Sequence, residues 1–314
     1  MQFSPDGKHI VIGGNDGTVR RWRVEEGRDD ASEVGKLVHS PEREMSAVSK
    51  DGKWIILATE GRRVTVWDAT THERVVESID AHEEKITALD VSPDSSKIAS
   101  GSRDGTVIVW CLGTGQRIAG PLKQGRPVLS VRFSPTGDRL ASAGSDFSIH
   151  VWSIRSDNFR STTCVPTDPA CSLAWSDDGN RLFTGCYQGS ILCFDISSST
   201  PAITKWPGHP HSDSVSTLCL SNNGKFIISA SSLESSVKIW DVDTQSEILF
   251  LEHTGEVLDA NISPDDGYLV SGTKNGKISV WNLRKVLPMR YFFRVGLDIC
   301  DIDHLVLNVF SVSL

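Results

Sequence analysis

The sequence predicts an all-β protein, a propeller of seven four-stranded antiparallel blades whose first blade is incomplete at its N-terminus. The prediction depends on a sevenfold repeat, on recurring turns inside each repeat, and on third strands that are apolar throughout. Seven short apolar segments end in an aromatic residue, at Trp22, Trp67, Trp110, Trp152, Phe194, Trp240 and Trp281. These aromatics lie 45, 43, 42, 42, 46 and 41 residues apart, and a period of about 40–45 residues is typical of one propeller blade.

The third repeat shows how one blade is built. Residues 86–91 and 97–101 are predicted as its first two strands. Asp104-Gly105 then turns the chain back, because glycine tolerates the positive φ that a tight hairpin needs. The third strand, 106–110, is β-branched and apolar, which indicates burial on both faces. A fourth strand begins at 116–119. Blades of this kind must stack radially to bury both faces.

Residues 1–282 are therefore assigned to one propeller domain, and residues 283–314 to a tail outside the repeats. Met1 stands where other repeats end their first strand, so most of that strand is missing from the first blade. Residues 289–295 are aromatic-rich and are expected to supply the outer strand of blade seven, whereas 296–314 fits no repeat register. One hypothesis is an N-terminally incomplete gene product with an unrelated extension; the alternative is a natural tail that clips the ring shut.

The chain resembles the WD40-repeat family over residues 1–282, because turn, hairpin and tryptophan recur in register. The resemblance implies a buried hydrogen-bonded network of His, Ser or Thr, Asp and Trp in each blade. Carried over by position, the third repeat has His82, Ser100, Asp104 and Trp110, and the seventh has His253, Ser271 and Trp281 with Asn275 replacing Asp. The sixth keeps His209, Ser229 and Trp240, with Glu234 near the Asp position in a turn one residue longer. The fourth keeps Ser142, Asp146 and Trp152, with Lys123 and Gln124 where the His would fall. Because these residues recur once per blade, we interpret them as structural and not catalytic.

Composition narrows the class of function. The net charge is −8 with no run of Lys or Arg, which argues against a nucleic-acid surface. No apolar stretch approaches the roughly 20 residues of a membrane helix. The seven cysteines form no CxxC pair and suit a reducing intracellular compartment, cytoplasmic or nuclear. His209, His211 and Asp213 could form a metal corner, but His209 is assigned to the network, so we expect no metal and no cofactor.

No GxxxxGK[ST], GxSxG or HExxH motif is present, so an enzyme is not predicted. We expect a monomeric, non-catalytic scaffold that binds proteins or peptides within a larger assembly. The alternative is a substrate receptor of a cullin-type ubiquitin ligase, because 152–155 and 281–284 read Trp-x-x-Arg, although both lack the Asp of the Trp-Asp-x-Arg motif. An enzymatic propeller, the third possibility, would need a convergent site in the central channel.

The expected partner surface is a rim where the second-to-third-strand turns gather with the loops between blades. Phe147 replaces the usual glycine of one such turn, and Tyr187 stands in the next repeat where Arg103 stands in the third. Tyr and Arg are enriched in interface hot spots, so Arg103, Phe147 and Tyr187 are predicted to form a partner-binding patch. The alternative is that Phe147 folds back onto its own blade. Loop charges of both signs around this rim suit a protein or peptide ligand.

Overall fold

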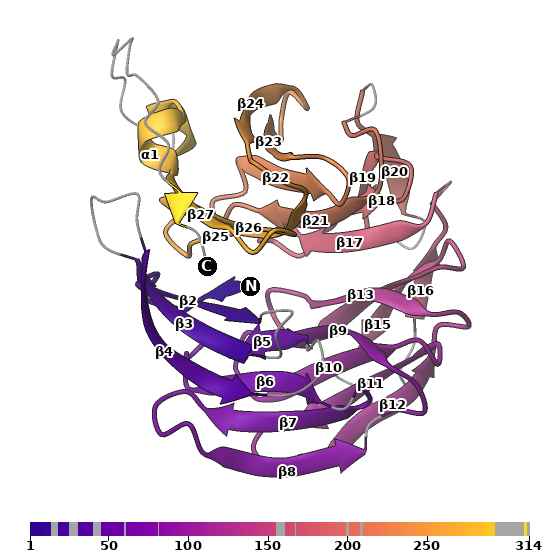
Figure 1. Cartoon of the computed structure of the whole chain (residues 1–314). Coiled ribbons are helices and arrows are strands. Elements are labelled where there is room, and N and C mark those ends of the chain that lie inside the picture. Colours follow the sequence, from indigo (N-terminus) through magenta and orange to yellow (C-terminus); the bar gives the residue numbers. More distant parts are fainter. Residues whose placement is uncertain are drawn as a thin grey trace.

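Seven four-stranded antiparallel sheets form a ring, which confirms the predicted all-β propeller (Figure 1). The structure is a computed structural model that describes residues 1–13, 18–24, 31–39, 45–59, 61–80, 82–154, 161–166, 168–198, 201–207, 210–292 and 311–312. Within each sheet the strands pair in chain order. The innermost strands of neighbouring blades contact one another all the way round, and the innermost strand of blade 1 contacts those of blades 2 and 7.

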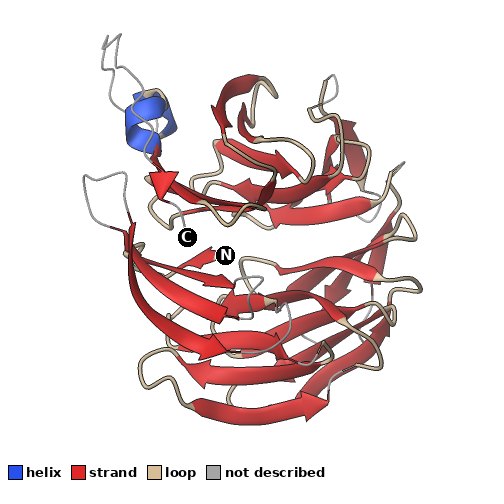
Figure 2. Cartoon of the chain, in the orientation of Figure 1, coloured by secondary structure: helices blue, strands red, loops and turns tan. Residues whose placement is uncertain are grey.

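Strands make up almost all of the regular structure, as Figure 2 shows. Blades 1 to 3 comprise β1 (Gln2–Phe3), β2 (His9–Gly13), β3 (Thr18–Val24), β4 (Ala31–His39); β5 (Ser46–Val48), β6 (Trp54–Thr59), β7 (Arg63–Asp68), β8 (Arg74–Asp80); and β9 (Ile86–Val91), β10 (Lys97–Ser102), β11 (Thr106–Cys111), β12 (Arg117–Lys123). Blades 4 and 5 comprise β13 (Val128–Phe133), β14 (Arg139–Gly144), β15 (Ile149–Ser153), β16 (Ser161–Cys164); and β17 (Ala170–Trp175), β18 (Arg181–Cys186), β19 (Ile191–Asp195), β20 (Ala202–Lys205). Blades 6 and 7 comprise β21 (Val215–Leu220), β22 (Phe226–Ser231), β23 (Ser236–Asp241), β24 (Glu247–Glu252); and β25 (Val257–Ile262), β26 (Tyr268–Thr273), β27 (Ile278–Asn282), β28 (Ser311–Val312).

The turn between the first two strands of a blade is held by a recurring Ser–Asp pair. In blade 3 the Ser92 hydroxyl donates to Asp94 Oδ1 at 2.5 Å and accepts the backbone N–H of Lys97 at 2.8 Å. The equivalent side-chain bonds in other blades are Ser49–Asp51, Ser176–Asp178 and Ser263–Asp265. These bonds satisfy polar groups at the point where the strand ladder stops, which explains why the same turn residues recur along the sequence.

The hydrophobic core lies between the blades. β11 buries four consecutive residues, 107–110. Of these, Ile108 packs in a cluster with Ile56 of blade 2, whereas Val109 packs in a cluster with Val131 of blade 4. Each such side chain contributes about 1.5–3 kcal/mol when it is fully buried. The third strands are therefore apolar throughout because both of their faces are covered by neighbouring blades.

The first blade has four strands, but its innermost strand β1 is only Gln2 and Phe3. This confirms the predicted shortening of the first blade at its N-terminus. Blades 1 and 7 share no strand in the described chain. They meet at a junction, here called the seam, whose apolar residues are Phe3, Ile10, Trp22, Val24, Val270, Ile278 and Val280. Two polar contacts add to it: Asn261 Nδ2 donates to the carbonyl of Met1 at 3.2 Å, and the Met1 amino group pairs with Asp259.

The outer strand of blade 7 differs from the prediction. Ser311 and Val312 form β28 and pair with Ser279 and Ile278 of β27, although 296–314 was expected to fit no register. Of the segment 289–295 that was expected to be this strand, 289–291 forms the 3₁₀ turn η1, and 293–295 lies outside the described residues.

The physical reason is that the segment after β27 buries its apolar side chains against blade 6 and does not extend beside β27. The short helix α1 (Leu283–Val286) is capped by the Asn282 side chain and leads into η1 (Met289–Tyr291). Leu283, Leu287 and Tyr291 enter a core cluster with residues of blades 6 and 7. The Tyr291 hydroxyl also donates to Asp241 Oδ2 at 2.7 Å. Tyr291, one of the aromatic residues that suggested a strand, is thus buried in this cluster instead.

Candidate protein-binding surface

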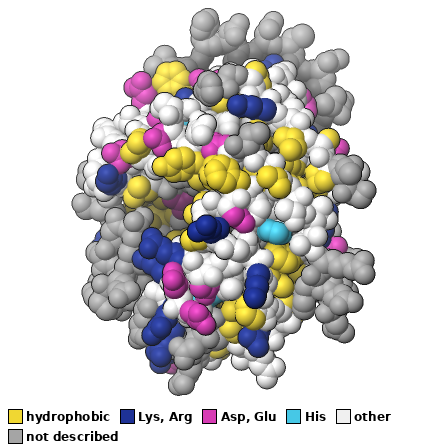
Figure 3. All heavy atoms as spheres, turned by 90° about the vertical axis from the view of Figure 1, so that its right-hand side faces the viewer, with side chains coloured by type: hydrophobic (Ala, Val, Ile, Leu, Met, Phe, Trp, Pro, Cys, Tyr) yellow, Lys and Arg dark blue, Asp and Glu magenta, His cyan; other side chains and the backbone are white. Residues whose placement is uncertain are grey.

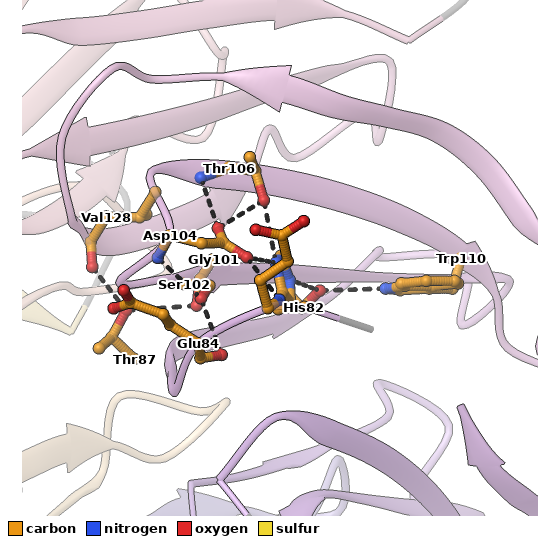
Figure 4. Close-up of polar contacts among 11 residues, drawn as sticks. His82, Glu84, Thr87, Gly101, Ser102, Asp104, Thr106, Trp110 and Val128 are labelled. Atoms are coloured by element: carbon orange, nitrogen blue, oxygen red, sulfur yellow. Dashed lines mark hydrogen bonds and ion pairs between the residues drawn. The ribbon is translucent and has the colours of Figure 1, made fainter. Parts of the chain in front are cut away.

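A chain of hydrogen bonds runs through the interior of blade 3 (Figure 4). Trp110 Nε1 donates to Ser100 Oγ at 3.0 Å, and Ser100 Oγ lies 2.8 Å from His82 Nε2. His82 Nδ1 lies 3.1 Å from Asp104 Oδ2 and 3.0 Å from Thr106 Oγ1. An ionised carboxylate only accepts, so Nδ1 carries the proton that faces Asp104, and in the neutral imidazole Nε2 then accepts from the Ser100 hydroxyl. Burial lowers the pKa of His82 below 6.5, against the opposing effect of Asp104, which favours this neutral form.

Blade 6 contains the same chain, but with a different histidine from the one expected. His211, not His209, lies 2.7 Å from Ser229 Oγ, which accepts from Trp240 Nε1 at 2.8 Å. His211 Nδ1 faces Glu234 Oε2 at 2.6 Å. His209 lies outside the described residues. The assignment of His209 from its Gly-His dipeptide was wrong.

The electrostatics of this blade follow from burial and hydrogen bonding. Burial lowers the pKa of His211, while Glu234 opposes that shift. Burial alone would raise the pKa of Glu234, but bonds from the Ser212 backbone and His211 outweigh it and lower that pKa to about 2. Both nitrogens of His211 are therefore engaged by protein groups, away from any metal corner. Among the described residues no group of three or more His, Cys, Asp or Glu side chains could hold a metal ion.

Blade 4 completes the network with glutamine in place of histidine. The Ser142 hydroxyl donates to Gln124 Oε1 at 2.6 Å and accepts from Trp152 Nε1 at 2.8 Å. The Gln124 amide donates to Ser148 Oγ at 2.8 Å. The glutamine thus offers one acceptor and one donor in the places where neutral histidine offers Nε2 and Nδ1–H. We expected blade 4 to lack the network residue that histidine provides in other blades. The structure corrects that expectation, because Gln124 takes its place.

Blade 7 keeps only part of the network. His253 Nε2 lies 2.5 Å from Ser271 Oγ, but its Nδ1 faces the carbonyl of Leu251 at 2.9 Å. Trp281 Nε1 is buried and has no hydrogen-bond partner among the described residues. The ring of Trp281 instead packs against His253, with centroids 5.6 Å apart. Of the predicted network residues, the structure therefore joins all four in blade 3 and only His253 with Ser271 in blade 7.

The turns between second and third strands, and the loops between blades, lie at one end of the ring because successive strands alternate in direction. Backbone bonds tie them together: Arg103 N–H donates to the Lys85 carbonyl and Tyr187 N–H to the Pro169 carbonyl, both at 2.9 Å. We call this end the rim. From blade 2 onward its described residues are 61–62, 82–85, 102–105, 123–127, 144–148, 165–166, 168–169, 186–190, 206–207, 210–214, 232–235, 253–256 and 274–277.

Arg103, Phe147 and Tyr187 all lie on this rim, on the consecutive blades 3, 4 and 5. Arg103 is exposed, Phe147 is 44% exposed and Tyr187 is 63% exposed. Phe147 has φ of +64°, close to the +77° of Gly105 at the same turn position in blade 3. About half of the Phe147 side chain is thus available to a partner. No hydrogen bond, ion pair or ring contact among the described residues joins the three side chains to one another.

A profile described as "WD domain, G-beta repeat" matches residues 1–23, 73–111, 117–153, 160–195, 201–241 and 245–282. The chain belongs to the WD40 family. The profile passes over most of the second repeat, yet β5 to β8 form a four-stranded WD40 blade like the others.

Several curated WD40 relatives are similar over most of the chain or part of it. Autophagy-related protein 16 of Arabidopsis thaliana is 26% identical over 282 residues, which is 88% of this chain and 45% of that protein. Protein groucho of Drosophila melanogaster is 23% identical over 90% of this chain and 32% of its own length. Small ribosomal subunit protein RACK1 of Glycine max is 28% identical over 36% of this chain and 38% of its own. The chain therefore spans less than half the length of each of these relatives.

Among the described residues of blades 4 to 6, the WD40 rim carries two further exposed apolar residues that sequence reasoning missed. Leu233, in the β22–β23 turn of blade 6, and Val165, between blades 4 and 5, are each 63% exposed. Leu233 could have been found from sequence, because it interrupts a turn of serines and a glutamate, Ser231-Ser232-Leu233-Glu234-Ser235. Val165 gives a weaker signal, since it follows directly on the outer strand β16.

The charged rim residues of this WD40 ring are not equivalent. Glu256 pairs with Lys274 at 2.8 Å, and Asp168 is buried, with Oδ2 accepting the Gln188 N–H at 2.7 Å. On one face of the molecule, hydrophobic side chains gather in a band bordered by acidic and basic ones (Figure 3).

Of the two Trp-x-x-Arg arginines, Arg284 pairs with Asp265 at 2.9 Å, and Arg155 lies outside the described residues. No helix in the described part of the chain is long and apolar enough to cross a membrane.

Proposed function

We propose that this WD40 propeller is a non-catalytic scaffold that captures proteins or peptides on its rim as part of a larger assembly. The observation that carries the proposal is the presence of large apolar side chains on the rim at three neighbouring blades. Phe147, Tyr187 and Leu233 are 44%, 63% and 63% exposed in turns that are otherwise polar. Exposed apolar residues gathered on one surface are typical of interaction sites.

The energetics of the turn support a binding role for Phe147. A residue other than glycine at positive φ costs roughly 1–2 kcal/mol, and the equivalent turns of blades 3 and 5 use Gly105 and Gly189. Residues held in such strained conformations are concentrated at functional sites. A half-exposed Phe recovers only part of this cost by packing within the chain, and a partner that covers the ring would recover more.

The family relationship supports the same class of function. The names of two relatives state that they act with or within an assembly: actin-interacting protein 1 of Caenorhabditis elegans and small ribosomal subunit protein RACK1. The six described cysteines are free, in keeping with our proposal of an intracellular location. A cullin-type substrate receptor is not favoured by the site, since Arg284 is already engaged by Asp265.

Affinity purification followed by mass spectrometry tests the proposal. The full chain is compared with a double variant, Phe147→Ala with Tyr187→Ala. A matched control is Ile203→Ala with Phe250→Ala, which removes two apolar side chains, each 51% exposed, from outer strands β20 and β24. Partners recovered with the wild type should be depleted by the rim variant and retained by the control. Equal recovery with all three proteins, each folded at the assay temperature by circular dichroism, would show that the rim is not the binding surface.

A further inference from the structure

The rim is divided into a basic half and an apolar half that follow one another around the ring. From blade 2 to the start of blade 4 its exposed cations are Arg62, Lys85, Arg103, Lys123 and Arg126. From blade 4 to blade 6 its exposed large apolar residues are Phe147, Val165, Tyr187 and Leu233. The order along the rim follows the order of the blades, so the last cations directly precede the first apolar residue.

The cations of the basic half are available to a ligand. Among the described residues none of them lies within 4.0 Å of a carboxylate oxygen, in contrast to Lys274, which pairs with Glu256 on blade 7. Among the described residues of this half the acids are the exposed Glu83 and Glu84 and the half-buried Asp104, three against five exposed cations, so positive charge is in excess there. This excess stands out because the whole chain carries a net charge of −8.

The acids of the apolar half are already used inside the protein. Glu234 accepts from His211 and from Ser212, and Asp146 accepts from the Ser148 hydroxyl at 2.7 Å. Asp213 accepts the backbone N–H of Ser214 at 2.5 Å. The carboxylates of the apolar half are thus engaged by hydrogen bonds within the protein, whereas the cations of the basic half remain open to a ligand beside the exposed apolar residues.

We infer that the partner segment recognised by this rim is a peptide that carries acidic residues next to large apolar side chains. The inference rests on the proposed function and specifies its ligand. Carboxylates of the peptide would pair with Arg103, Arg126 and their neighbours, which steers the encounter and sets the direction of the peptide. The adjoining aromatic or aliphatic side chains would bury Phe147 and Tyr187, where most of the affinity is expected.

The test is selection from a random twelve-residue peptide display library on the immobilised full chain. Enriched peptides should contain more Asp and Glu than the starting library, together with Leu, Phe, Trp or Tyr. Synthetic versions of the enriched peptides are then measured by fluorescence anisotropy. Their affinity should fall as salt is raised from about 50 to about 500 mM, because exposed charge pairs are screened.

Two variants and one control separate the contributions. Arg103→Glu with Arg126→Glu should weaken acidic peptides about tenfold or more, because like charges would then face each other. Phe147→Ala with Tyr187→Ala should weaken the same peptides about tenfold through lost apolar contact. The control, Arg117→Glu with Lys205→Glu, reverses two exposed cations on outer strands β12 and β20 and should leave affinity unchanged.

The outcomes distinguish the inference from the proposed function. Enriched peptides that are neutral or basic, yet lose affinity in the Phe147→Ala, Tyr187→Ala variant, would overturn the inference and leave the proposed function standing. Peptides that are indifferent to both rim variants would overturn both, because they bind elsewhere. Failure to enrich any peptide would also count against both.

Discussion

The left-handed turn at Phe147 allows stability and binding to be separated by two substitutions at one position. Phe147→Ala removes the ring but keeps a Cβ at φ of +64°. Phe147→Gly removes the ring and the steric strain together. The two variants lack the same side-chain contacts with a partner, so both should lose binding equally. They should differ in stability, because only glycine adopts this conformation without a steric cost.

The magnitudes follow from the exposure and backbone angle of Phe147. The side chain is 44% exposed, so its burial within the chain contributes roughly 1 kcal/mol, about half of the 1.5–3 kcal/mol for a fully buried apolar side chain. Phe147→Ala should therefore cost about 1 kcal/mol. Glycine relieves roughly 1–2 kcal/mol of strain and loses about 0.5–1 kcal/mol through the greater freedom of the unfolded chain. Phe147→Gly should thus be about 0.5–1 kcal/mol more stable than Phe147→Ala.

Thermal melting of the three proteins at one scan rate checks this order. For a chain of this size a difference of 0.5–1 kcal/mol corresponds to about 1–2 °C. Anisotropy with an enriched peptide should show the same loss of affinity for both variants. If Phe147→Ala melts at or above the temperature of Phe147→Gly, the left-handed turn is not held in solution and the reasoning from strain fails.

Three further outcomes are expected. Cys111 should be alkylated by iodoacetamide near neutral pH well before Cys186. Hydrogen bonds from Thr114 lower the pKa of the Cys111 thiol, whereas burial raises the pKa of Cys186 to about 12. Peptide mapping measures both alkylation rates, and equal rates would contradict this expectation. Gln124→Leu should destabilise the protein by about 2–3 kcal/mol, because it leaves buried polar partners unsatisfied. Gln124→His should be tolerated. Equal melting temperatures for the two variants would refute the role of Gln124 in the network. Burial lowers the pKa of His82 and His211 below the unfolded value of 6.5, so the unfolded state binds protons more readily than the folded state. The free energy of unfolding should therefore fall as the pH drops below about 6.5. Urea midpoints that do not decrease from pH 7.5 to pH 5 would contradict this expectation.

The fold could be predicted because its signals are local. Each blade is specified by turn chemistry and by β-branched runs within about 40 residues, as the Asp104-Gly105 hairpin and the buried strand β11 illustrate. The tail could not be predicted in the same way. Whether 289–295 becomes a strand or a turn depends on contacts such as that of Tyr291 with Asp241, 50 residues away in sequence, and no local pattern reports them.

The network could have been predicted further than it was. His82 precedes its serine by 18 residues, and His211, His253 and Gln124 precede theirs by the same 18. Counting back from the serine would have selected His211 over His209 and would have selected Gln124 as the residue in place of histidine. The Gly-His dipeptide was misleading because the chemistry depends on reach across the blade and not on the preceding glycine.

The apolar half of the rim was predicted only in part, for a reason of the same kind. Phe147 and Tyr187 were identified because they depart from a hairpin pattern. Leu233 interrupts a polar turn and could have been identified in the same way, whereas Val165 required knowledge of exposure, since an apolar residue beside an outer strand such as β16 is as often covered as open.

The seam gives the ring one joint unlike the other six. Elsewhere adjacent blades are tethered by the peptide chain, so a blade that separates from its neighbour is held at high local concentration and returns quickly. Blades 1 and 7 have no such tether in the described chain and depend on packing such as that of Phe3 and Ile10 against Val270. The described blades are therefore expected to separate first at this joint. A partner that bound across blades 1 and 7 would hold them together and raise the stability of the whole propeller.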